Sequence, residues 1–204
     1  MTVEGDGSEG VSGSSPAFRH LGDRLVYKGH IWHVSVGTFE APDGERFERD
    51  VIRSPGAVGV VPVLFEDDAP LVVLVRQYRG PLDRQVLEIP AGMRDVPDEA
   101  PEVTAQRELI EEAGLSAGRL DYLTHFYSSA GMTDSILHVY LATELSPVER
   151  DLHGPEETHM EVLRIPLADA VDMVVRGEIH DAKTVIGLLL VDRRLREGTL
   201  RPAP

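Results

Sequence analysis

The sequence predicts an α/β (or α+β) protein in which a mixed sheet packs between helices, preceded by an N-terminal antiparallel sheet. Residues 24–53 alternate apolar and polar side chains, as half-buried antiparallel strands do. Residues 57–66 and 70–79 are apolar runs rich in β-branched side chains, which is typical of strands buried on both faces. Residues 167–198 repeat apolar positions at the spacing of helices.

The N-terminal part of the chain is predicted to hold a tail and a small sheet. Residues 1–17 are acidic and rich in Gly and Ser, so we expect a disordered tail. Residues 18–54 are expected to form an N-terminal β-sheet subdomain with a hairpin at Pro42, Asp43 and Gly44. Residues 55–204 are long enough to form one larger domain around its own core.

The larger domain is predicted to run through strands, one acidic helix, more strands and two final helices. The acidic helix covers residues 101–113, and Gly114 is a suitable C-terminal stop. The other predicted ranges are strands at 57–66, 70–79, 85–92, 120–129, 136–145 and 161–167, a loop at 146–160, and helices at 167–179 and 182–198.

Composition limits the function classes. The net charge of −15 argues against nucleic acid or an anionic membrane as a partner, and it means that an anionic substrate needs an added cation. The chain has no cysteine, so thiol chemistry and thiolate metal sites are excluded. The sequence shows neither a membrane-length apolar run nor the features of a signal peptide, which predicts a cytoplasmic protein.

Three glutamates crowd the predicted acidic helix. Glu108 and Glu112 lie four positions apart, so their side chains point the same way, and Glu111 flanks the same surface. Such like charges repel one another, whereas a hard cation such as Mg²⁺ binds carboxylate oxygens and removes the repulsion. The alternative is a solvated acidic face, but the adjacent Arg107 favours a site because it can orient a carboxylate.

The spacing of residues around this cluster resembles a known motif. Gly92 is followed after six residues by Glu99, and after seven more by "RELIEEAGL" at 107–115. This resembles the Nudix box, G-x5-E-x7-R-E-U-x-E-E-x-G-U with U aliphatic, with one extra residue in its first half. That variation resembles ADP-ribose pyrophosphatases. The resemblance implies a Nudix α/β/α sandwich and Mg²⁺-dependent hydrolysis of a nucleoside diphosphate linked to another group.

Other segments resemble the same subfamily, so that the resemblance covers roughly residues 25 to 195. They are "VRQYR" at 75–79, "LEIPAG" at 87–92, "SSAGMTDS" at 128–135 and "GEIHDAKTVIGLL" at 177–189. Two positions depart from the pattern, because relatives usually carry proline in place of Ala130 and glutamate in place of Ser135. The implied reaction is hydrolysis of ADP-ribose to AMP and ribose 5-phosphate.

The resemblance implies a set of metal ligands. Glu108 and Glu112 match direct ligands, Glu111 matches a ligand or a water-bridged partner, and the Ala91 carbonyl matches a backbone ligand. The expected cofactor is Mg²⁺, with Mn²⁺ as a possible substitute. Glu111 and Arg107 are also counted among the catalytic residues, and Glu99 is expected to hold the loop in place, for example by pairing with Arg107.

The resemblance also implies a general base on a loop after the central strands. Glu157 is the first candidate there and Glu156 the second, the alternative being that both are solvated loop charges. His153 and His159 lie nearby and titrate near neutrality, but surface histidines are common.

Further residues are expected to contact substrate. Arg79 follows an apolar strand and offers paired donors for a phosphate, with Arg76 beside it; ion pairs with acidic residues are the alternative. Glu88 matches a position at the edge of the site in relatives. The loop residues expected at the terminal ribose are Gly131, Met132 and Asp134.

The remaining expectations concern the N-terminal sheet and rival functions. Trp32 and Phe39 could stack on adenine, although aromatic residues in strands more often belong to a core. The resemblance implies a homodimer formed through the N-terminal strands. Rival functions are Nudix hydrolysis of another nucleoside diphosphate sugar, NADH or a dinucleoside polyphosphate, a non-catalytic ADP-ribose sensor, or a plain acidic metal-binding or interaction domain.

Overall fold

The computed structural model describes residues 17–152 and 158–201, which divide into two compact units between Ile52 and Arg53. The predicted base candidates Glu156 and Glu157, and with them His153, lie outside the described residues. In the described part of the chain, every helix is too short or too polar to cross a membrane.

The first unit is a three-stranded sheet in the order β1 (Arg19–Lys28), β2 (His33–Glu40) and β3 (Arg46–Arg53). β1 and β2 are antiparallel, and the turn between β2 and β3 is closed by a 3.0 Å hydrogen bond from the Gly44 N–H to the Ala41 carbonyl. Gly44 has a φ of 89°, which glycine adopts without strain. The predicted N-terminal strands and their hairpin turn are therefore confirmed.

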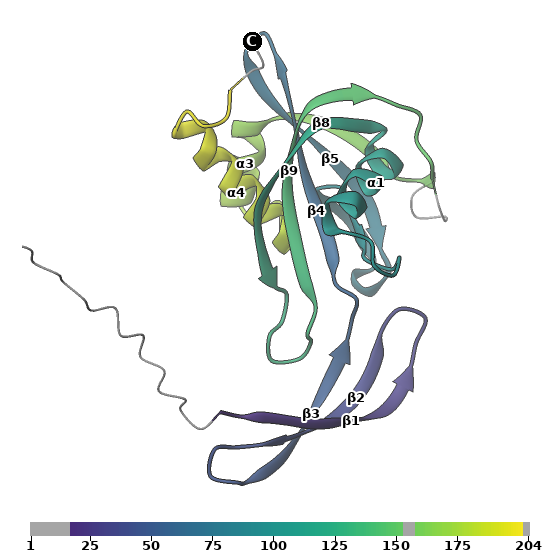
Figure 1. Cartoon of the computed structure of the whole chain (residues 1–204). Coiled ribbons are helices and arrows are strands. Elements are labelled where there is room, and N and C mark those ends of the chain that lie inside the picture. The colour runs from purple at the N-terminus through teal and green to yellow at the C-terminus, as the bar shows by residue number, and fades with distance from the viewer. Residues whose placement is uncertain (1–16, 153–157, 202–204) are drawn as a thin grey trace, which may run out of the picture. The chain divides into compact units, whose positions relative to one another are not determined.

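The second unit is built on a mixed sheet (Figure 1). The main order is β10 (Glu161–Pro166), β5 (Ala69–Arg79), β4 (Ala57–Glu66), β9 (Ile136–Pro147) and β8 (Leu115–Tyr127). Two short strands lie off this path, β6 (Arg84–Glu88) on β5 and β7 (Ala91–Met93) on β4. The central neighbours β4 and β9 are parallel, whereas β4–β5, β4–β7, β5–β6, β5–β10 and β8–β9 are antiparallel pairs.

Helices cover both faces of this sheet (Figure 1). Helix α1 (Pro101–Ala113) packs on one face, and α3 (Leu167–Val175) and α4 (Ala182–Arg196) pack on the other. Val58 and Val60 of β4 join the core under α1, whereas Val61 and Val63 join the core under α3 and α4. Because β4 feeds two cores, its sequence is apolar throughout, as predicted, and the α/β/α sandwich is confirmed.

Several predicted boundaries were wrong. The single strand expected at residues 85–92 is two strands, because the chain leaves β5 after Glu88 and Pro90 cannot donate a ladder hydrogen bond. β8 begins at Leu115, directly after α1, rather than at residue 120, and β9 continues to Pro147 into the predicted loop.

Candidate active site

The C-terminal half of α1 carries its glutamates toward β7. The helix starts with Pro101 at its first position and ends at Gly114, whose φ of 66° lets its N–H reach the Ile110 carbonyl at 3.0 Å. Near that end, the Glu112 carboxylate accepts a 2.8 Å hydrogen bond from the Ala91 N–H. The helix is thereby joined to the strand that precedes the predicted loop.

Gly92 leaves room for the Glu108 carboxylate. A Cβ atom on Gly92 would lie 2.0 to 2.2 Å from the carboxylate atoms of Glu108, so the carboxylate would have to move if this residue had a side chain. Glu108 and Glu112 are both buried. The first glycine of the motif thus allows the Glu108 carboxylate to lie directly against the backbone, where a side chain would displace it.

Arg107 binds the acidic residues that surround it. Its Nη1 atom lies 2.8 Å from Glu108 Oε1 and 3.0 Å from Glu111 Oε2, and its Nη2 atom lies 3.5 Å from Glu99 Oε2. Burial opposes its charged form, but the charges of Glu108, Glu111 and Glu99 outweigh burial and raise the pKa of the Arg107 guanidinium. The expected pairing of Glu99 with Arg107 is present, and Glu99 also accepts a hydrogen bond from Thr104 Oγ1 at 2.7 Å.

Burial makes Glu112 a weak acid in the cation-free protein. Loss of solvent raises the pKa of Glu112 to about 8, the Ala91 N–H lowers it, and the nearby charge of Glu108 raises it further. The positive charges of Arg79 and Lys183 also lower the pKa of Glu112, so this carboxyl group is close enough to interact with both.

The predicted metal ligands are not preassembled into a cage. Within the two described ranges, no group of three or more His, Asp or Glu side chains is arranged to hold a metal ion. The physical reason is that the guanidinium of Arg107 lies between Glu108 and Glu111, while Glu112 is hydrogen bonded to the backbone. The metal roles of Ala91, Glu108, Glu111 and Glu112 stay predictions.

A second group of charges lies where β5, β6 and the start of α4 meet. Arg79 at the end of β5 donates to both carboxylate oxygens of Glu88, at 2.7 Å each. Glu88 is 2% exposed and also pairs closely with Lys183 of α4. Burial alone would raise the pKa of Glu88, but Arg79 and Lys183 outweigh it and hold that pKa below its ordinary value. Glu88 is therefore a buried anion held by two cations.

Asp181 connects this group to the first turn of α4. Its side chain caps the helix by accepting from the Thr184 N–H at 3.0 Å, and it also accepts from Lys183 Nζ at 3.0 Å. Thr184 Oγ1 in turn accepts a 2.9 Å hydrogen bond from the N–H of Ile89, which is the residue after β6. Sequence reasoning named neither Lys183 nor Asp181. The available indication was a lysine near the start of the predicted helix, two positions after a residue type that commonly caps helices.

An open cavity of about 470 Å³ adjoins these charges. Its volume falls within the usual range for small-molecule sites. Its polar lining residues are Arg79, Arg84, Glu88, His180, Asp181 and Lys183.

Arg76 lies apart from this group. It is an odd number of positions from Arg79 on β5, so the two side chains leave opposite faces of the strand. Arg76 Nη1 pairs with Glu161 Oε2 at 2.9 Å, at the position directly opposite on β10. The structure thus places it in the ion pair that was the alternative, and its substrate role stays a prediction.

The predicted ribose loop is anchored rather than free. Asp134 accepts hydrogen bonds from Arg53 Nη1 and from the Ser54 N–H, both at 3.1 Å, so it holds the chain that enters β4. Met132 is half exposed, and a Cβ atom on Gly131 would meet no neighbour. Their substrate contacts stay predictions.

The two aromatic candidates belong to the N-terminal unit. Phe39 stacks on Phe47, with ring centroids 5.6 Å apart, as the packing alternative expected. Trp32 is 53% exposed and lines a surface cavity of about 350 Å³ with Tyr27 and Ile52. Among the described residues of the first unit, Trp32 is therefore not part of a buried core.

Comparison with known proteins agrees with this architecture. The NUDIX domain model matches residues 53–186. The ADP-ribose pyrophosphatase of Bacillus subtilis (strain 168) is 39% identical over 163 residues, which cover 80% of this chain and 86% of the relative. The methanol dehydrogenase activator of Bacillus methanolicus is 35% identical over 163 residues, with the same coverage of 80% and 86%. A solved crystal structure of ADP compounds hydrolase superposes with a TM-score of 0.75 at 25% identity, covering 89% of this chain and 95% of the other. The motif at residues 92–115, the sandwich around it and these matches together show that the chain belongs to the NUDIX domain family.

Proposed function

We propose that this protein hydrolyses the diphosphate bond of ADP-ribose to give AMP and ribose 5-phosphate. The observation that carries the proposal is the Nudix box, with Glu108 and Glu112 buried beside Gly92 and Ala91. The substrate follows from the ADP-ribose pyrophosphatase relative and from the solved ADP compounds hydrolase.

The donor set fits a divalent cation, for which we propose Mg²⁺ with Mn²⁺ as a substitute. Carboxylate and carbonyl oxygens suit hard cations, and Glu108 and Glu112 both lie beside the backbone of β7 at Gly92 and Ala91. Glu108, Glu111, Glu112 and the Ala91 carbonyl would hold the ion. When bound, it supplies positive charge against the diphosphate and makes water more acidic.

The remaining residues bind substrate and manage the proton. Arg79 lines the cavity beside Glu88 and is suited to hold a substrate phosphate through paired donors. Glu88 fixes Arg79 with two hydrogen bonds, and Lys183 keeps Glu88 charged. Glu157, and after it Glu156, is our candidate to take the proton of the attacking water.

The first experiment measures AMP release from ADP-ribose by the purified protein. We expect release with Mg²⁺ or Mn²⁺ and none with a chelator. Glu112→Gln should lower kcat by at least about 100-fold, as expected when a catalytic centre loses an electrostatic group. Glu102→Gln, an exposed position on the same helix, is the matched control and should retain activity. Full activity of Glu112→Gln would overturn the assigned mechanism.

A substrate panel tests the choice of ADP-ribose. Other nucleoside diphosphate sugars, NADH and dinucleoside polyphosphates share the reacting diphosphate, so they are the rival substrates of the same site. We expect kcat/KM to be highest for ADP-ribose. A higher value for another compound would keep the reaction and change the substrate.

We also propose that the protein is a homodimer. In the first unit, β1 is exposed along its whole length, and large apolar side chains on or beside it are open to solvent. Exposed apolar surface of this extent marks an interaction site, and a second copy of the chain is the occupant we propose. The residues are Phe18, Leu21, Leu25, Val26, Tyr27, Ile31 and Trp32.

Sedimentation velocity tests the dimer. The wild-type protein should sediment as a dimer, Val26→Glu as a monomer, and Arg24→Gln on the same strand as a dimer. A wild-type monomer at micromolar concentration would rule the proposal out.

A further inference from the structure

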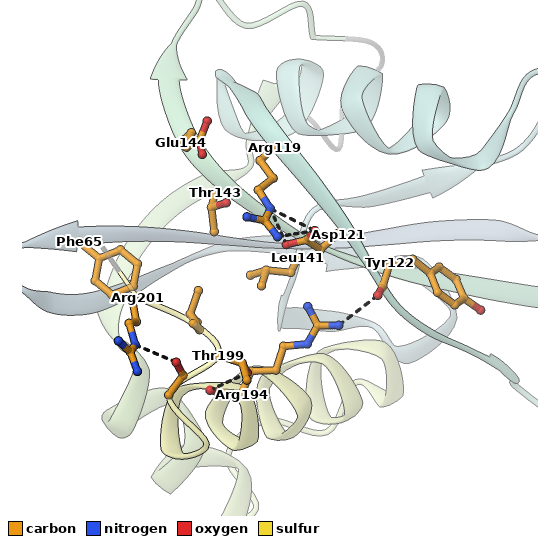
Figure 2. Close-up of a pocket in the computed structure, with 12 residues that line it drawn as sticks. Phe65, Arg119, Asp121, Tyr122, Leu141, Thr143, Glu144, Arg194, Thr199 and Arg201 are labelled. Atoms are coloured by element: carbon orange, nitrogen blue, oxygen red, sulfur yellow. Dashed lines mark hydrogen bonds and ion pairs between the residues drawn. The ribbon is translucent and has the colours of Figure 1, made fainter. Parts of the chain in front are cut away.

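A second cavity lies between the C-terminal end of α4 and strands β8 and β9 (Figure 2). Its volume is about 650 Å³, which is larger than that of the cavity beside Glu88. Arg194 and Arg201 line it from the helix side, and Arg119 lines it from β8. None of its lining residues belongs to the proposed hydrolytic site.

Within the described residues, the side chains of Arg194 and Arg201 are bonded only to backbone oxygens. Arg194 Nη2 donates to the Tyr122 carbonyl at 3.2 Å, and Arg201 Nε donates to the Gly198 carbonyl at 2.8 Å. Among the residues that the structure places, no carboxylate pairs with either guanidinium. Two arginines without an acidic partner are notable in a chain with 35 acidic and 20 basic residues.

Neighbouring arginines of the same helix show the contrast. Arg193 Nε pairs with Glu197 Oε1 at 2.8 Å, and Arg196 Nε pairs with Asp192 Oδ2 at 2.8 Å. Neither of them lines the cavity. Nearby carboxylates therefore neutralise Arg193 and Arg196. The guanidinium of Arg194 is instead directed into the cavity and keeps N–H donors available there (Figure 2).

The acidic residues of the cavity lie on its strand side. Asp121 pairs with Arg119 at 2.9 Å, and Glu144 lies beyond Thr143 on β9 (Figure 2). An anion would be repelled there and attracted to the helix side. Phe65, Leu141 and Leu200 add an apolar part to the lining, which a bare inorganic anion would not use.

We propose that this cavity, which we call the arginine pocket, binds an organic phosphomonoester, with its phosphate at Arg194 and its organic part against Phe65 and Leu200, while Arg201 adds positive charge to the same lining. Arginine presents planar paired donors that match phosphate oxygens. The site is separate from the proposed hydrolytic centre. It stands whether or not ADP-ribose is hydrolysed, because it concerns binding alone.

Calorimetric titration without divalent cation tests the proposal. AMP and ribose 5-phosphate are the organic probes, and inorganic phosphate is the bare anion. In Arg194→Gln/Arg201→Gln, we expect the Kd of at least one organic probe at this site to rise about tenfold or more, or its binding event to disappear. Arg193→Gln/Arg196→Gln carries the same loss of charge outside the pocket and should bind as the wild type does. Comparison of AMP with ribose 5-phosphate also shows whether the pocket accepts a nucleoside, a sugar or both as the organic part.

Three results would overturn the proposal: unchanged binding of both organic probes in the pocket variant, an equal loss in the control variant, or inorganic phosphate binding as tightly as either probe. Thermal melting checks that the variants fold. If the double variant does not fold, Arg194→Gln alone is used, because the only side-chain bond of Arg194 in the described chain is to a carbonyl. Binding of the organic probes should also weaken as salt is raised.

Discussion

Gly92 is the residue at which the smallest change should have a selective effect. In Gly92→Ala, the added methyl group overlaps the Glu108 carboxylate, which is the flexible end of its side chain and can move aside. We therefore expect the protein to fold with a modest loss of stability, while kcat for ADP-ribose falls by at least about 100-fold because the carboxylate is displaced. Urea unfolding and steady-state kinetics measure the two effects.

A double variant separates the overlap from other causes. Glu108→Ala in the Gly92→Ala background removes the atoms that clash, so stability should recover while activity does not. A stability loss that persists in the double variant would contradict the assigned contact.

Glu88 is the buried charge on which the substrate side of the site depends. Glu88→Gln leaves Lys183 and Arg79 without their carboxylate, and removing one partner of a buried ion pair costs about 3–5 kcal/mol. The folded-state pKa of Glu88 lies below its ordinary 4.5, so its stabilisation is complete above pH 4.5 and is lost as pH falls through the folded value. The free-energy difference between wild type and variant should therefore be largest near pH 7 and shrink below pH 4.5.

Urea unfolding at several pH values measures this difference. Glu66→Gln is the matched control, because its ion pair with Arg164 is more than half exposed and such pairs contribute about 0–1 kcal/mol. A Glu88→Gln variant as stable as wild type at pH 7 would show that the pairs are absent in solution.

At the scale of elements, the start of α4 combines a structural and a chemical role. Asp181 caps the helix through the Thr184 N–H and contacts Lys183. Asp181→Ala removes both interactions and should cost at least about 1 kcal/mol. Asp181→Asn keeps a good capping oxygen and loses only the charge, so it should be more stable than the alanine variant. Urea unfolding of the two variants ranks them, and the reverse order would contradict the cap.

Strands and helices were predictable from the sequence where their pattern of apolar residues matches a single kind of burial along the whole element. The apolar runs of β4 and β5 indicated burial on both faces, and the two cores on either side of β4 explain why. The break between β6 and β7 was missed, although Pro90 marked it. Lys183 could not be assigned, because helical spacing does not reveal which strand end a helix will meet. Its contact with Glu88 joins positions 95 residues apart.

At the scale of the whole molecule, the Nudix motif predicted the fold and the family because its residues are close in sequence as well as in space. Glu88 and the loop at Gly131 were predicted from the resemblance, since they come from separate strands and loops, whereas Arg79 was predicted from its place after an apolar strand. The arginine pocket had no sequence indication, because Arg119, Arg194 and Arg201 line one cavity only through the packing of α4 against the sheet.

Dimer formation predicts a property of the whole molecule. If the exposed apolar residues of the first unit are covered by a second copy, association stabilises the folded state by mass action. The Tm should then rise with protein concentration for the wild type and stay constant for Val26→Glu. Differential scanning calorimetry over a hundredfold range of concentration measures this, and a constant wild-type Tm would contradict dimer-linked folding.

The cap of α4 has a further consequence for how the enzyme loses activity on warming. Helix ends open more readily than sheet cores, and the opening of one turn need not unfold the protein. Here that turn carries Asp181 and Lys183, so its fraying would release Glu88 and, with it, the hold on Arg79. We expect the enzyme to lose activity on heating at temperatures below the Tm of the second unit, in which the sheet unfolds. In hydrogen exchange, the amides of Thr184 and Val185 should lose protection in step with activity, ahead of those in β4.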